Sequence, residues 1–207
     1  MRGSSHLIIG TACGVAISQV GDFTSNETIA IVATSAIAGL VPDLDTNGKL
    51  RNKLTFYRTL IYSLFTLVGL AIMGYAFWKG VGYQQWIGGT LGFSLLILPR
   101  IVLTPKVLLF VTGVAFIIAG FTIEEWWLLG FGLYTAIASQ LSHRGLTHSV
   151  LGLVAFGWIV FELEKSLGLQ GVMLSGVIGY LSHLIADMRL FNKKGVRLFQ
   201  PFNKKEL

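Results

Sequence analysis

The chain has 207 residues, of which 53% are hydrophobic and only 13% are charged. Soluble domains carry about 25% charged residues, so this composition excludes an ordinary soluble domain and indicates that lipid surrounds most of the chain. The net charge of +6 does not indicate a nucleic-acid partner, because the chain lacks a soluble basic domain that would present this charge.

Eight apolar runs predict an all-α membrane protein, a polytopic helical bundle of six to eight transmembrane or re-entrant helices. These runs are 7–20, 28–41, 59–77, 86–98, 107–121, 126–141, 150–163 and 170–187. A helix needs about 20 residues to span a bilayer, and only 59–77 and 170–187 approach that length. Either of the first two runs could be re-entrant. No linker divides the chain, so we expect a single domain over residues 1–207.

Basic residues gather on one side when the runs are threaded alternately through a bilayer. Of all Lys and Arg residues, only Lys79 and Lys165 fall on the opposite side. The positive-inside rule makes the basic side cytoplasmic. We therefore expect a multi-pass protein of the cytoplasmic membrane with both termini in the cytoplasm. The ionisable residues near positions 6, 43–45, 143–149 and 183–187 then all lie at the cytoplasmic face.

His183 and Asp187 lie four residues apart in the last run, so both side chains project from one face of the predicted helix. That spacing suits two ligands of one ion, or a ligand and the carboxylate that orients it. For an isolated pair of this kind, a structural hydrogen bond is the alternative.

His143 and His148 are five residues apart, which places them about 140° from each other on a regular helix. A break or turn at Gly145 would let both imidazoles face inward. Thr147 could hold the local backbone or donate to a ligand oxygen. Arg144 is a planar cation suited to gripping a phosphate, and its alternative is an anchor at a helix end.

Asp43 and Asp45 close the second run, just after Pro42, which ends or kinks a helix. Two acids spaced by one residue in a loop can chelate or bridge a cation. The alternatives are a capping turn or a surface salt-bridge cluster with the basic residues that follow. His6 precedes the first predicted helix, where it is a further ligand, a cap or a headgroup contact.

Together these residues indicate a metal site. Ionisable groups within a bilayer cost roughly 2.5–3.5 kcal/mol each, so they are usually functional. One Zn²⁺ takes about four ligands, whereas two ions about 3.5–4 Å apart that share a carboxylate would use a larger set. Imidazole with carboxylate suits Zn²⁺, which we expect first, and also Mn²⁺ or Fe²⁺. The candidate metal ligands are His6, Asp43, Asp45, His143, His148, His183 and Asp187.

The stretches 6–10, 42–45, 143–149 and 179–187 resemble, in this order, the YdjM-like family of membrane-bound metal-dependent hydrolases. The His-Arg-Gly-x-Thr-His-Ser motif of residues 143–149 is the specific part, and the similarity extends to about Pro201. The resemblance implies a divalent-metal hydrolase of the cytoplasmic membrane with the seven candidate ligands as its polar motif positions. Motif segments 1–58 and 138–201 would then flank scaffold helices 59–137. The substrate is not supplied by the resemblance.

We therefore expect a hydrolase that acts on a phosphoester of a lipid or of another membrane-proximal substrate, in the manner of a phospholipase. Its partners would be membrane lipids and an anionic headgroup that Arg144 and nearby lysines attract. Arg144 would neutralise charge that develops in the transition state. Asp45 or Asp187 could act as the base instead of a ligand, and Thr147 could act as a donor.

Two other classes of protein use the same residues. A metal or ion transporter, or a metal sensor, would bind the ion transiently, since intramembrane acids and histidines also form ion relays. The absence of an acid in the middle of a run argues against transport, because no path leads to the other face. A purely structural metal site that ties helix ends together is the remaining alternative.

Overall fold

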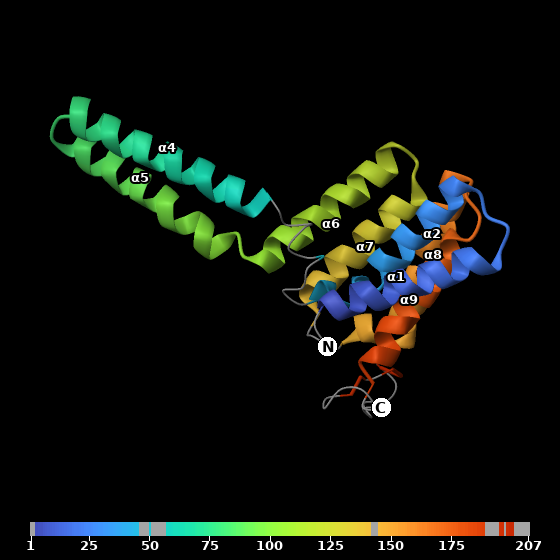
Figure 1. Ribbon diagram of the computed structural model, residues 1–207. Coiled ribbons are helices and arrows are strands. Elements are labelled where there is room, and N and C mark those ends of the chain that lie inside the picture. The colour runs from blue at the N-terminus through green and yellow to red at the C-terminus, as the bar shows by residue number, and fades with distance from the viewer. Residues whose placement is uncertain are drawn as a thin grey trace. The chain divides into compact units, whose positions relative to one another are not determined.

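The computed structural model describes residues 3–45, 50, 57–141, 145–188, 195–196 and 198–200. Within these residues the protein contains helices and no strands (Figure 1), which confirms the predicted all-α class. Each of the eight apolar runs coincides with one α-helix. The α-helices are α1 (Gly3–Val20), α2 (Ser25–Ala38), α4 (Tyr57–Lys79), α5 (Tyr83–Val102), α6 (Pro105–Thr122), α7 (Trp126–Gln140), α8 (Val150–Leu167) and α9 (Val172–Ala186). Two 3-10 helices, η1 (Val41–Asp45) and η2 (Leu146–His148), complete the set.

The chain divides into two compact units. The smaller unit, residues 55–108, is built on the hairpin of α4 and α5, whose ends are joined by a hydrogen bond of 2.6 Å from the Tyr62 hydroxyl to the Leu103 carbonyl. The larger unit comprises residues 1–54 and 109–207. All the helix contacts discussed below lie within the larger unit. The prediction of one domain over residues 1–207 stays a prediction.

Three of the described helices are long and apolar enough to cross a membrane: 58–79 within α4, and all of α5 and α6. Between 11% and 17% of their apolar windows is buried inside the protein, so most of their side chains face outward. An outward-facing apolar surface of this extent suits contact with lipid. Helix α9, expected to approach spanning length, has 15 residues, because Gly171 with φ +85° precedes it and Asp187 ends it.

Helices α1, α2 and α9 meet in close backbone contact around Ser35. A Cβ atom added at Gly10 would lie 2.6 Å from the Ser35 carbonyl oxygen, and one added at Gly179 would lie closer still. The Ser35 hydroxyl donates a 2.7 Å hydrogen bond to the Gly10 carbonyl. Small residues at helix contacts let backbones approach in membrane proteins. We call this contact the Ser35 crossing.

Three polar groups lie one helical turn from the Ser35 crossing: the side chains of His6 and His183 and the carbonyl of Gly39. His6 precedes Gly10 by four residues, and His183 follows Gly179 by four. Gly39 follows Ser35 by the same interval, and a Cβ atom added there would lie 2.8 Å from the His6 carbonyl. One helical turn rises about 5.4 Å, so the three positions arrive at one level of the bundle.

The chain turns sharply after α2. The apolar run predicted to continue to residue 41 leaves the α-helix at Ala38, and η1 follows it. Pro42 has no backbone N–H with which to extend the α-helix. Val41 and Leu44 are fully buried, so η1 is held against the core. This turn places Asp43 beside His183 of α9 and Asp45 beside His148 of η2.

The Ser35 crossing can be tested with Gly179→Ala. The added methyl would meet the backbone of α2, so we expect overpacking to lower the free energy of unfolding by about 1–3 kcal/mol. The matched control is Gly157→Ala in α8, where the added Cβ would lie 3.5 Å from a Val177 methyl, an ordinary contact. Alanine is the better helix former by up to about 1 kcal/mol, so this control should not destabilise. Thermal unfolding in detergent gives both values, and equal effects would exclude the crossing.

Candidate metal centre

Four segments of the larger unit bring five ionisable side chains together. Helix α1 supplies His6, η1 supplies Asp43, η2 supplies His148, and the end of α9 supplies His183 and Asp187. All except Asp43 are buried, and the Asp43 side chain is 16% exposed. These side chains form the candidate metal centre.

One triad consists of Asp43, His148 and His183, whose ligand atoms all lie within 4.8 Å of one another. Asp43 Oδ1 is 3.6 Å from His148 Nε2 and 3.8 Å from His183 Nε2. The two Nε2 atoms are 3.3 Å apart. This triad joins the two 3-10 helices to α9, and we call it the Asp43 triad.

A second triad, the His6 triad, consists of His6, His183 and Asp187. His6 Nε2 lies 3.5 Å from Asp187 Oδ1, and the rings of His6 and His183 stack with their centroids 3.8 Å apart. The other oxygen, Asp187 Oδ2, lies 3.7 Å from His183 Nε2 and 3.9 Å from His148 Nε2. The Asp187 carboxylate therefore faces both triads, with one oxygen toward each.

His183 can bind only one ion at a time. Its Nδ1 lies 2.8 Å from the Gly39 carbonyl, which only accepts hydrogen bonds, so Nδ1 carries a proton and donates it. In the neutral ring the remaining lone pair is on Nε2, which points toward both triads. An outer hydrogen bond of this kind fixes the tautomer of a metal-ligating histidine.

His148 is oriented by a hydrogen-bonded relay. The Thr147 hydroxyl donates its single proton to Asp45 Oδ2 at 2.8 Å, so its 3.1 Å contact with His148 Nδ1 requires the ring nitrogen to donate. Asp45 Oδ2 itself lies 3.5 Å from that nitrogen. The neutral ring then presents the Nε2 lone pair to the triads. Asp45 lies on the outer side of His148.

The electrostatics of this region favour a cation. Burial lowers the pKa of His148, but the close carboxylates of Asp43 and Asp45 and their charges outweigh burial and raise it to about 9. Burial raises the pKa of Asp43, but the close contact with His148 and the charges of His183 and His148 outweigh it, so the pKa is lowered. Carboxylates that stabilise a proton on His148 would also stabilise a metal ion in its place.

The donor set fits a divalent metal. The nitrogen–oxygen separations of 3.5–3.9 Å exceed the 2.7–3.2 Å typical of hydrogen bonds. A tetrahedral ion with bonds of about 2.0–2.2 Å keeps its ligand atoms about 3.3–3.6 Å apart, which is close to the observed spacing. Imidazole and carboxylate are the donors that Zn²⁺, Mn²⁺ and Fe²⁺ accept.

Most residues predicted from the sequence meet in this centre. His6 lies in the first turns of α1 instead of before the helix, and it is 1% exposed. The break expected at Gly145 is present, because η2 begins there and His148 turns inward. His143 and Arg144 lie outside the described residues.

Sequence reasoning missed a tyrosine pair behind η2. The Tyr180 hydroxyl donates to the Thr147 carbonyl, which cannot donate, so the 2.7 Å contact between the two hydroxyls has Tyr134 as its donor. Tyr180 is fully buried in α9, three residues before His183. That helical spacing was the available signal, since residues three apart share a face.

The fold and the centre define a helical membrane protein with a buried His/Asp cluster placed to hold a metal ion. The model of the YdjM inner membrane protein family matches residues 1–207, and the chain therefore belongs to this family. Neither the comparison with curated proteins nor that with solved structures gives a match.

Because His183 belongs to both triads, we predict that substituting it removes more metal than substituting His6. We expect His183→Ala to lose the ion of the Asp43 triad, which His183 would bind, whereas His6→Ala should retain that ion. Asp22→Asn removes an exposed acid elsewhere and should keep wild-type content. Elemental analysis of the detergent-purified proteins measures this, and wild-type content in His183→Ala would exclude the assignment.

The relay through Thr147 predicts a difference between two conservative variants. Thr147→Val removes the hydroxyl that holds His148 Nδ1, and we expect metal affinity to fall by about 10–100-fold. Thr147→Ser keeps a hydroxyl and should stay near the wild type. Competition titration with a metal indicator gives the dissociation constants, and equal constants for both variants would contradict the relay.

Proposed function

We propose that this protein is a membrane-bound metal-dependent hydrolase that cleaves a phosphoester of a lipid or of another membrane-proximal substrate. The observation that carries the proposal is the Asp187 carboxylate, whose two oxygens face two His-containing triads. A carboxylate between two neighbouring cation sites is typical of centres that hydrolyse phosphate esters. Membership of an inner membrane protein family supports a membrane location.

We further propose six to eight membrane-inserted helices, with both termini and the metal centre at the cytoplasmic face. The distribution of basic residues supports this topology. The described helices other than α4, α5 and α6 are shorter, less apolar or more charged, and they would be re-entrant or tilted. An anionic headgroup could then reach the centre from the cytoplasmic surface.

The two triads suggest how ions would be shared. Asp43, His148 and His183 would hold one ion, with Asp187 Oδ2 beside it. Because His183 Nε2 has one lone pair, a second ion beside His6 and Asp187 Oδ1 needs a further ligand, and we propose His143 for this role. Bound Zn²⁺, Mn²⁺ or Fe²⁺ would supply Lewis-acid stabilisation of phosphoryl oxygens and an activated water.

The side chains around the ions would have separate roles. Asp43 is the most exposed of the five, so substrate would approach from its side. Asp45 is fully buried and bonded to Thr147, which supports a positioning role for both residues through His148. Arg144 would bind the phosphate and neutralise charge in the transition state.

Turnover of a defined lipid tests the proposal. In phosphatidylcholine nanodiscs that contain phosphatidic acid and phosphatidylglycerol, we expect the protein with Zn²⁺ or Mn²⁺ to release phosphate or a headgroup product. Chelation and His183→Ala should reduce the rate to background, while Asp22→Asn should match the wild type. Product analysis by mass spectrometry gives the rates.

Two results would overturn the proposal. Metal flux into proteoliposomes that depends on Asp43 and Asp187, without lipid cleavage, would identify a transporter. A chelator that unfolds the protein, with no phosphoester cleaved in any preparation, would identify a structural metal site.

A further inference from the structure

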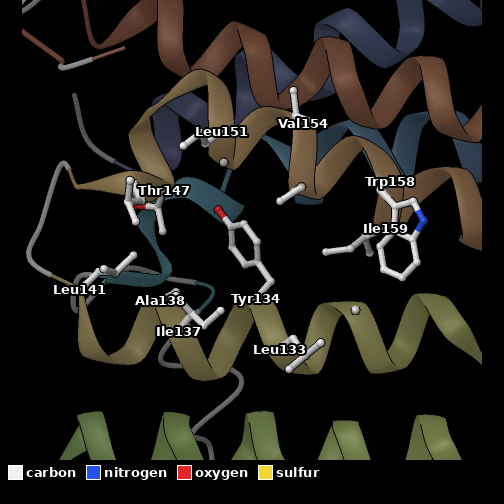
Figure 2. Close-up of a pocket in the computed structure, with 14 residues that line it drawn as sticks. Leu133, Tyr134, Ile137, Ala138, Leu141, Thr147, Leu151, Val154, Trp158 and Ile159 are labelled. Carbon is white, nitrogen blue, oxygen red and sulfur yellow. The ribbon is translucent and has the colours of Figure 1, made fainter. Parts of the chain in front are cut away.

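An elongated cavity of about 450 Å³ lies between α7 and α8 in the larger unit (Figure 2). Its volume falls within the range of about 300–1,000 Å³ found for small-molecule sites. Among the described residues of its lining, the side chains with polar atoms are those of Tyr134, Thr147 and Trp158. We call it the α7–α8 cavity.

One end of the α7–α8 cavity adjoins the metal centre. Figure 2 shows Thr147 at this end and Trp158 at the other, with Tyr134 rising from α7 between them. The Thr147 hydroxyl is the same group that bonds Asp45 and orients His148. The lining residues of α8 extend from Leu151 to Ile159, and at 1.5 Å per residue they cover roughly 12 Å.

Two of these three polar side chains, Tyr134 and Thr147, donate to partners within the protein. Tyr134 donates its hydroxyl proton to Tyr180, and Thr147 donates its proton to Asp45. The interior therefore offers little to bind water, and apolar cavities of this kind stay dry. Hydrocarbon is the filling that suits such a lining.

The rim of the α7–α8 cavity lies on an apolar outer surface. Ile137 on α7 is 55% exposed, and Val154 on α8 is 64% exposed. In a membrane protein such side chains face lipid, so an acyl chain can enter from the bilayer without crossing water. A lipid suits this cavity better than a soluble apolar compound does. Only a lipid has a head that would extend toward the metal centre while its chain fills the cavity.

We propose that the α7–α8 cavity binds one hydrocarbon chain of the lipid substrate and so places its phosphoester at the metal centre, an inference that rests on the proposed function. A chain that moves from bilayer to cavity gains little hydrophobic free energy, because lipid is equally apolar. The contribution is orientation: the chain fixes the distance and direction of the head, and well-oriented reactants react faster.

Photolabelling tests occupancy independently of turnover. The protein is placed in phosphatidylcholine nanodiscs with a small fraction of phosphatidic acid that carries a diazirine in the middle of one acyl chain. After irradiation, peptide mapping should find the label concentrated on α7 and α8 residues of the α7–α8 cavity. The same pattern should appear in His183→Ala, which the proposal leaves able to bind the chain.

Filling the cavity should displace the chain. Ala155 is exposed and lines the cavity, so Ala155→Phe occupies its space, and we expect a severalfold loss of label and of hydrolysis rate. Ile137→Trp does the same from the opposite wall if the first variant fails to fold. Ala12→Phe, at an exposed position of α1, is the matched control and should change neither.

The outcomes separate the two proposals. Label spread evenly over outward faces, or unchanged in Ala155→Phe and Ile137→Trp, would overturn the cavity proposal even if lipid is hydrolysed. Hydrolysis unaffected by both filling variants would overturn it as well. Cavity-specific label that both variants remove, without hydrolysis, would support a lipid-chain site and contradict the proposed function.

Discussion

The metal centre depends on the close backbone contact of α1, α2 and α9 at Ser35. Glycines at positions 10 and 179 remove the side chains that would hold these helices apart. Because His6, Gly39 and His183 each lie one turn from this contact, their level in the bundle is fixed by it. Both helices that carry the stacked rings of His6 and His183 take part in this contact.

Burying His148 and His183 is costly, and the structure offsets that cost through hydrogen bonds to their outer nitrogens. His183 uses Gly39 at the end of α2, and His148 uses Thr147 and Asp45, which are 102 residues apart in the chain. Each interaction satisfies an outer nitrogen and aims the inner one at the triads. A buried polar group without such a partner would cost several kcal/mol. Orientation and stability therefore come from the same contacts.

The two 3-10 helices connect the metal centre with the tyrosine pair and with the α7–α8 cavity. In η1, one acid faces the triads and the next acid stands behind His148. In η2, the Thr147 hydroxyl bonds Asp45 and orients His148, and the Thr147 carbonyl accepts a hydrogen bond from Tyr180. Thr147 also lines one end of the α7–α8 cavity. A lipid chain in that cavity would thus end beside the residue that positions His148.

The sequence by itself determined the helices and the candidate ligands. Apolar runs without competing strand patterns gave the eight α-helices, Pro42 and Gly145 gave the turns, and the cost of charge in lipid singled out the histidines and aspartates. Only the tertiary structure decided that Asp43 faces the triads while Asp45 stands behind His148, and that His183 offers a single nitrogen. It alone revealed the Ser35 crossing, the tyrosine pair and the α7–α8 cavity. The physical reason is that the orientation of each ligand depends on contacts between segments far apart in the chain, which helical periodicity does not encode.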